Sequence, residues 1–207
     1  MLPDPHTRMI LNQARFDEAI CLFDAANSED PHQEIVDGQP YPKELLYGQR
    51  MSACLHAVAP NAPEAVQLAA RCQHIRRWTI PRQDFPMDRP GYHKWRNTLK
   101  KFHAQLASEI LQQVGYDADT IQRVQALLQK QQLHLDPEMQ LLEDVICLVF
   151  LQYYFLDFAA QHPEDKIIDI VQKTWRKMTP EGHQLALQLP LAPEAQKLIG
   201  KALGGGE

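Results

Sequence analysis

The sequence has no closely spaced cysteine pair and no glycine-rich loop, and each absence argues against a class of protein. Its four cysteines, Cys21, Cys54, Cys72 and Cys147, are too far apart for a CxxC motif, so a zinc knuckle or a thioredoxin-like site is not indicated. A phosphate-binding glycine loop and the GxSxG nucleophile motif are missing as well. We expect four reduced thiols in a cytoplasmic protein.

Long apolar runs are also missing. The most apolar stretch, residues 145–160, is interrupted by Gln152 and Asp157, and it is shorter than the ~20 residues that span a bilayer. The first residues lack the apolar segment of a signal peptide. We therefore expect no membrane partner, and we interpret residues 145–160 as part of a central buried helix.

Most of the chain has apolar residues at helical spacing, and no segment alternates as a strand would. The 207 residues predict an all-α fold, a single-domain multi-helix bundle over residues 1–190, followed by a C-terminal helix and flexible tail over 191–207. The longer helices are predicted at residues 8–26, 42–58, 61–78, 90–114, 119–132, 137–161 and 164–178. Residues 28–42 and 79–90 are predicted to be loops.

One stretch, residues 71–101, differs in charge from the rest of the chain. It holds nine Lys or Arg residues and two Asp, a formal charge of +7, whereas the whole chain carries −5, so the remaining residues carry −12. Aromatic residues and three prolines are interleaved with these charges. This mixture is typical of a pocket for an anion or a patch for a nucleic acid.

Two helices joined by the loop at 79–90 are expected to pack antiparallel, so their polar faces meet and the loop forms a lid. Arg71, His74 and Trp78 are expected to share one helical face. The predicted substrate-binding residues are Arg76, Arg77, Trp78, Arg82, Arg89, Tyr92, Trp95, Arg96 and Lys100. The alternative is a structural network of arginines and carboxylates that closes the loop over the core.

Histidines and carboxylates on separate helices form a second candidate group. His56, His74 and His103 lie on three predicted helices, and Glu143 and Asp144 lie on a fourth. Imidazole and carboxylate groups from different helices of a bundle can converge on Zn, Fe or Mn. The alternative for each histidine is an ordinary interior or surface residue, and Glu143 needs a partner in its apolar helix.

The motifs QHIRRWTIPR, FPMDRPGYHKWR, LEDVICLVFL and KTWRKM resemble those of domain-of-unknown-function family 4202. The resemblance covers about residues 8–190. The name of the family assigns no activity.

The order of elements also resembles the HD-domain fold of metal-dependent phosphohydrolases and diiron oxygenases. That resemblance places an HD-like core at about residues 43–160. It implies a divalent metal, Fe, Mn or Zn, held by His56, His74, His103 and Asp144. His74, His103 and Glu143 are the predicted catalytic residues. Ile75 stands where the family has the Asp of its His-Asp doublet, which argues against a dinuclear site.

Three functions follow from these features. The first is an HD-like enzyme, a metal-dependent hydrolase or oxygenase, that acts on a phosphorylated or other anionic, nucleotide-like small molecule. The second is a non-catalytic module that binds a nucleotide or RNA through the same basic and aromatic stretch. The third is a scaffold whose basic stretch docks an acidic partner. The oligomeric state is not predicted.

Overall fold

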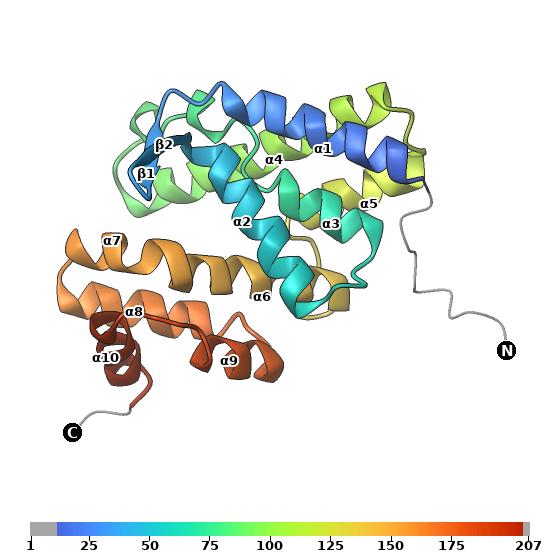
Figure 1. Ribbon diagram of the computed structural model, residues 1–207. Helices are drawn as coiled ribbons and strands as arrows, with labels where there is room; N and C mark the ends of the chain where they lie inside the picture. The colour runs from blue at the N-terminus through green and yellow to red at the C-terminus, as the bar shows by residue number, and fades with distance from the viewer. Residues whose placement is uncertain (1–11, 205–207) are drawn as a thin grey trace, which may run out of the picture. The chain divides into compact units, whose positions relative to one another are not determined.

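The computed structural model describes residues 12–204, and most of them are helical (Figure 1). The predicted all-α class is confirmed. The chain divides into two compact units, residues 1–132 and residues 133–207, and each is described by itself. The expectation of one domain over residues 1–190 stays a prediction.

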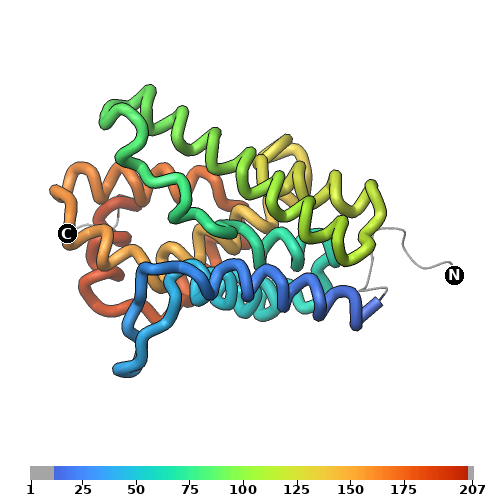
Figure 2. The backbone as a smooth tube through the Cα atoms, turned by 90° about the horizontal axis from the view of Figure 1, so that it is seen from above, coloured from blue at the N-terminus to red at the C-terminus, as the bar shows by residue number. Residues whose placement is uncertain are grey.

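The first unit consists of α1 (Gln13–Ser28), β1 (Gln33–Val36), β2 (Gln39–Pro42), α2 (Lys43–Val58), α3 (Glu64–Arg71), η1 (Arg77–Thr79), η2 (Arg82–Asp84), α4 (Arg89–Gln113) and α5 (Ala118–Leu128). Helix α4 packs on α5, α3 packs on both α2 and α5, and α1 contacts α2, α3 and α4. The long helix α4 extends along the unit in Figure 2. The buried core includes Phe23, Met51, Leu55, Leu68, Ile75, Leu111 and Leu127.

The second unit begins with α6 (Pro137–Val149), a π-helical turn (η3, Phe150–Tyr154) and α7 (Phe155–Ala160), where one continuous helix was predicted. Helices α8 (Glu164–Trp175), α9 (Pro180–Leu187) and α10 (Pro193–Ala202) follow. Asp136 caps α6, accepting hydrogen bonds from the amides of Glu138 and Met139. Within residues 12–204, no helix is both long enough and apolar enough to cross a membrane.

The loop predicted at residues 28–42 contains a β-hairpin, so that prediction is corrected. Strands β1 and β2 pair antiparallel, with Val36 opposite Gln39. The two residues between them, Asp37 and Gly38, have φ angles of 50° and 76°. Asp-Gly is a preferred sequence for such a two-residue turn because both positions require positive φ. The short flanking strands lack the apolar alternation that would have predicted them.

The third predicted helix is shorter than expected. Helix α3 ends at Arg71, and Arg76 adopts the left-handed conformation with a φ of 49°. The amide of Arg76 donates to Oδ1 of Asn27 at 2.9 Å instead of to a helical carbonyl. His74 therefore lies in a turn and Trp78 in the short 3-10 element η1, so the prediction that they share one helical face with Arg71 was wrong. This irregular segment gives His74 and Arg77 their positions.

Candidate functional site

Four polar and aromatic side chains of the first unit gather around the imidazole of His74. We call the five residues together the His74 cluster: Glu44, Tyr47, His74, Arg77 and His103. The ring of Tyr47 stacks on that of His74 at 4.1 Å. Oε2 of Glu44 lies 3.3 Å from Nδ1 of His74, and the His103 ring centroid lies 5.9 Å from that of His74. Nη1 of Arg77 lies 3.3 Å from each ring nitrogen of His74. Residues from α2, the turns after α3, and α4 thus meet at one place.

One buried side chain of α1, Asn27, supports two parts of this cluster. Its Nδ2 donates to the carbonyl of Glu44 at 3.4 Å, and its Oδ1 accepts from the amide of Arg76. The amide of Glu44 donates to Oδ2 of Asp30 at 3.0 Å, so a carboxylate caps the first turn of α2. These contacts fix the backbone at Glu44 and next to Arg77.

Arg77 is held by aromatic packing rather than by a carboxylate. Its guanidinium lies 5.1 Å from the ring centroid of Trp95, whose indole nitrogen donates to the carbonyl of Ile80 at 2.9 Å. Burial lowers the pKa of Arg77. Arg77 forms no salt bridge with any residue in the described range 12–204. A partly buried cation without a bound counter-ion is costly unless a ligand supplies one.

The titratable groups of the cluster are shifted away from their charged forms. Burial raises the pKa of Glu44 to about 7, although Arg77 opposes this shift. Burial, together with the positive charge of Arg77 and Arg96, lowers the pKa of His74 well below its usual value. The pKa of His103 is lowered by burial, by His74 and by the same two arginines. At neutral pH both histidines are neutral and Glu44 is about half protonated, so the cluster has a net positive charge.

One nitrogen of the cluster has no partner. His103 is 4% exposed, and its Nε2 forms no hydrogen bond within the described part of the chain. Leaving a buried polar atom unsatisfied costs about 1–3 kcal/mol. Such an atom in a native fold therefore points to a ligand, a water molecule or an ion that completes it.

The charge of the cluster fits an anion better than a divalent cation. The positive charges of Arg77 and Arg96 both act on His74. Nη1 of Arg77 also lies within hydrogen-bonding distance of both ring nitrogens of His74. No three His, Cys, Asp or Glu side chains among residues 12–204 are arranged to hold a metal ion. The metal site stays a prediction from the HD resemblance, and we derive no chemistry from it.

Several predicted substrate-binding residues have other contacts. Arg76 pairs with Glu29 at 2.7 Å and lies 5.8 Å from the ring of Trp78. Arg82 donates to the carbonyls of Phe85 and Asp88, so it closes the loop on itself, as the structural alternative predicted for an arginine. The other members of the predicted set outside the cluster lie along α4. Arg89 and Tyr92 are exposed, Arg96 and Lys100 are half-buried, and Trp95 is buried against Arg77.

The remaining predicted metal and catalytic residues lie elsewhere. His56 is exposed at the end of α2 and lines a separate small cavity of about 250 Å³ that Arg71 also borders. Glu143 and Asp144 belong to the second unit. There Glu143 lies 3.7 Å from Nζ of Lys177, and Asp144 accepts from the amide and hydroxyl of Thr179 at 2.9 and 2.5 Å. Asp144 thus supports the start of α9.

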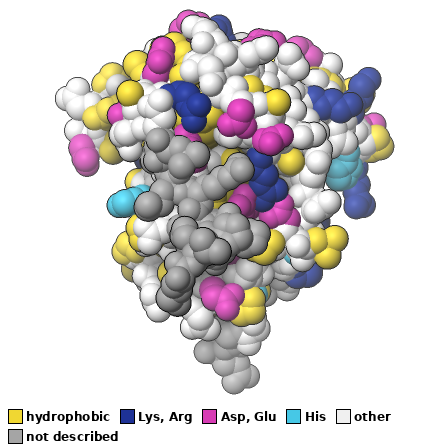
Figure 3. Space-filling model, turned by 90° about the vertical axis from the view of Figure 1, so that its right-hand side faces the viewer, with side chains coloured by type: hydrophobic (Ala, Val, Ile, Leu, Met, Phe, Trp, Pro, Cys, Tyr) yellow, Lys and Arg dark blue, Asp and Glu magenta, His cyan; other side chains and the backbone are white. Residues whose placement is uncertain are grey.

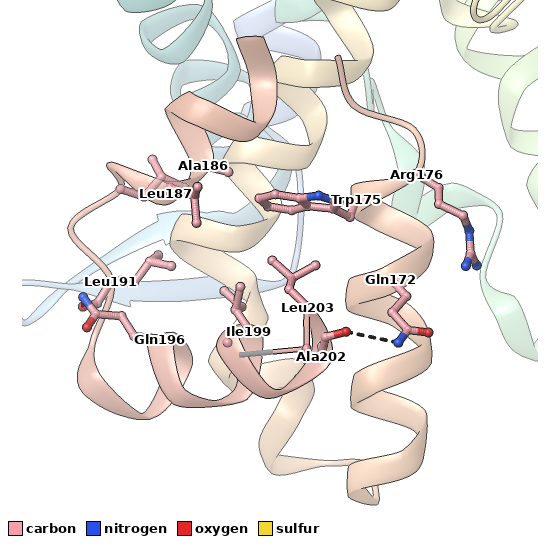
Figure 4. Close-up of a pocket in the computed structure, with 13 residues that line it drawn as sticks. Gln172, Trp175, Arg176, Ala186, Leu187, Leu191, Gln196, Ile199, Ala202 and Leu203 are labelled. Carbon is pink, nitrogen blue, oxygen red and sulfur yellow. Dashed lines mark hydrogen bonds between the residues drawn. The ribbon is translucent and has the colours of Figure 1, made fainter. Parts of the chain in front are cut away.

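The second unit has a hollow of about 1030 Å³ between α8, α9 and α10. Figure 4 shows the apolar side chains of Trp175, Ile199 and Leu203 directed into it, while Arg176 points away. The amide of Gln172 donates to the carbonyl of Ala202 at 3.1 Å across one side. Arg176 is the one charged residue of this lining within residues 12–204, and it points away from the hollow in Figure 4.

Sequence reasoning found His74, Arg77, Trp95, Arg96 and His103, but it missed Glu44 and Tyr47. A glutamate in the first turn of a helix is usually explained by the helix dipole. The spacing of Glu44 and Tyr47, three residues apart, places both on one face of α2. That spacing was the available signal, but it says nothing of which neighbour this face meets.

Comparison with known proteins agrees with the first resemblance. No curated protein and no solved structure matches the chain, and the HD-domain resemblance is not confirmed. A family model described as "Domain of unknown function (DUF4202)" matches residues 17–199. Because the match covers most of the 207 residues, the chain belongs to this family.

Proposed function

We propose that the His74 cluster binds an anionic small molecule, such as a phosphate ester, and that the protein is an enzyme acting on it by acid–base chemistry. The observation that carries this proposal is Arg77, a partly buried guanidinium with no salt bridge among residues 12–204. The acidic group whose charge acts most on Arg77 is Glu44, and it is only about half ionised at neutral pH. An incoming anion would supply the missing counter-charge.

The contact between Glu44 and His74 supports a catalytic role. A general acid or base works best when its pKa lies near the working pH, and burial brings Glu44 to about 7. Its Oε2 lies 3.3 Å from Nδ1 of His74, so the pair is positioned to exchange a proton. Groups with opposed pKa shifts in one site are typical of acid–base catalysis.

The binding part of the proposal is tested by titrating the full chain with inorganic phosphate and phenyl phosphate in a calorimeter. Arg77→Gln should weaken binding at least about tenfold, which corresponds to the loss of one charge-assisted hydrogen bond. Arg89→Gln, which removes an exposed arginine from the same basic stretch, should leave affinity unchanged. Equal affinity in all three proteins contradicts the proposal.

The acid–base part is tested by turnover of the same ester. Glu44→Gln should abolish turnover while phosphate binding remains, since the amide keeps the shape of the side chain but cannot exchange a proton. If the wild-type protein binds esters and turns none of them over, the site is a binding site and the enzyme proposal fails.

A non-catalytic nucleotide- or RNA-binding module is the second candidate. Tyr92 is 45% exposed, and the guanidinium of Arg82 lies 6.0 Å from its ring centroid, an arrangement that could stack a base. Against an extended polyanion, acidic as well as basic side chains occupy the face shown in Figure 3. A salt-sensitive affinity for single-stranded RNA that Tyr92→Ala reduces would favour this candidate.

A further inference from the structure

The tryptophan at the hollow of the second unit has a fixed ring plane. The imidazole of His183, on α9, stacks on the indole of Trp175, on α8, with ring centroids 4.1 Å apart and an angle of 1° between the planes. Nε2 of His183 also donates a hydrogen bond to the backbone carbonyl of Trp175 at 2.8 Å, since a carbonyl oxygen can only accept. These two contacts cover one face of the indole and hold it in one orientation.

The other side of this indole borders the hollow of about 1030 Å³ between α8, α9 and α10. Trp175 is one of the residues that line the hollow, and His183 is not. Figure 4 shows the side chains of Ile199 and Leu203 directed toward the indole. Trp175 and Leu203 are both half-buried. A flat aromatic wall therefore faces apolar side chains across a space as large as the pockets that bind small molecules.

The polar groups of the lining have little to offer a charged ligand. The side-chain amide of Gln172 donates to the carbonyl of Ala202 at 3.1 Å, and that of Gln196 donates to the carbonyl of Leu191 at 3.0 Å. Arg176 is the one charged lining residue within residues 12–204, and it points away. A charged group inside the hollow would lose its hydration without gaining a partner.

The chain beside the hollow does not supply the missing apolar group. Gly204 is the last described residue and belongs to the lining. Residues 205–207 follow it and read Gly-Gly-Glu, so they carry no apolar side chain. A separate apolar molecule fits the lining better than this segment does.

We propose that the hollow binds an uncharged small molecule with a planar aromatic ring, which stacks on the open face of Trp175 and packs against Ile199 and Leu203. A flat ring is favoured over a flexible chain because His183 fixes the plane of the indole. Stacked aromatic rings gain more than their buried area alone provides, and a rigid ring loses little conformational freedom on binding. The site belongs to the second unit, so the inference goes beyond the anion site proposed at the His74 cluster.

A matched pair of ligands tests the inference with the full chain at neutral pH. The aromatic member is 2-naphthol, and decahydro-2-naphthol has the same carbon skeleton without the flat ring. In calorimetry, 2-naphthol should bind one-to-one and at least about threefold more tightly than its saturated counterpart. It should also shift the indole N–H NMR signal of Trp175, which is identified by its loss in Trp175→Phe.

A matched pair of variants locates the ligand. Leu203→Glu places a charge in the lining and should abolish the binding of 2-naphthol. Gln184→Glu adds the same charge at an exposed position on α9 outside the lining, and it should leave the affinity unchanged. If Leu203→Glu does not fold, the ligand comparison and the Trp175 signal of the wild-type protein still decide.

Three results would overturn the inference. Equal affinity for the two ligands removes the stacking argument, and an unmoved Trp175 signal or full affinity in Leu203→Glu places the ligand elsewhere. If sedimentation shows a wild-type dimer that Leu203→Glu dissociates, the hollow is a contact between two copies of the chain instead. None of these measurements involves Arg77, so the anion site is tested separately.

Discussion

Nη1 of Arg77 lies 3.3 Å from both ring nitrogens of His74, so a fixed cation faces an imidazole that is kept neutral. The charge of Arg77 contributes to the pKa shift of each titratable group around it. The positive charge of Arg77 lowers the pKa of His74 and of His103 and opposes the upward shift at Glu44. The cluster therefore holds neutral acid–base groups beside a cation that lacks a salt bridge among the described residues.

Replacing Glu44 with glutamine should stabilise the protein in alkaline but not in acidic solution. The pKa of Glu44 rises from 4.5 to about 7 on folding, so its stabilising contribution is complete below pH 4.5 and is lost as the pH rises to about 7. The shift corresponds to a penalty of about 3 kcal/mol above pH 7, which Glu44→Gln removes. Urea unfolding at pH 5 and pH 8 measures the difference.

The matched control for this change is Glu18→Gln, which alters an exposed carboxylate on α1. Its free energy of unfolding should follow that of the wild-type protein at both pH values. If Glu44→Gln shows the same small effect at pH 5 and pH 8, the carboxyl group is not shifted and the acid–base proposal loses its basis.

The two histidines of the cluster, His74 and His103, should lower the stability of the protein in acidic rather than in alkaline solution. Their pKa values fall below 6.5 on folding. Their contribution to the free energy of unfolding is therefore complete above pH 6.5 and is lost as the pH falls. In the Glu44→Gln background, a further His103→Gln change should reduce the loss of unfolding free energy between pH 7 and pH 5. His56→Gln, at an exposed position on α2, should not reduce it. An unchanged acid loss in the His103 variant contradicts the assignment.

The sequence predicted the helices of this fold well because most carry their own end signals. Asp136 with Pro137 at the start of α6, and Gly115 with its φ of 82° after α4, are local signals of this kind. The end of α3 was not predicted, because the side chain that captures the Arg76 amide belongs to Asn27, 49 residues earlier. The pairing of Glu44 with His74 was missed for the same reason: it is a tertiary contact.

Asn27 should be important for both stability and binding. Asn27→Ala removes the hydrogen bonds to Arg76 and Glu44 from a side chain that is 2% exposed, and it should cost about 1–3 kcal/mol. Phosphate affinity should fall as well, because Arg77 then loses its fixed backbone. Asn97→Ala, at an exposed position on α4, should change neither quantity. Full phosphate affinity in Asn27→Ala would show that this support is dispensable.

Chelation should not change anion binding. The positive charge at the cluster comes from Arg77, with a further contribution from Arg96 on α4, so dialysis against EDTA should leave phosphate affinity at its original value in calorimetry. A loss of affinity that Mn²⁺, Fe²⁺ or Zn²⁺ restores would instead support the metal predicted from the HD resemblance, and it would require His74 or His103 to act as a ligand.

The central claim is that an anion binds beside Arg77, and the most direct test is a phosphate titration followed by the side-chain NMR signals of His74 and His103. Wild-type protein should show saturable shifts of both rings, whereas chloride at equal ionic strength should not produce them, and Arg77→Gln should abolish them. Unchanged ring signals across the phosphate titration, or identical shifts with chloride, would contradict the account.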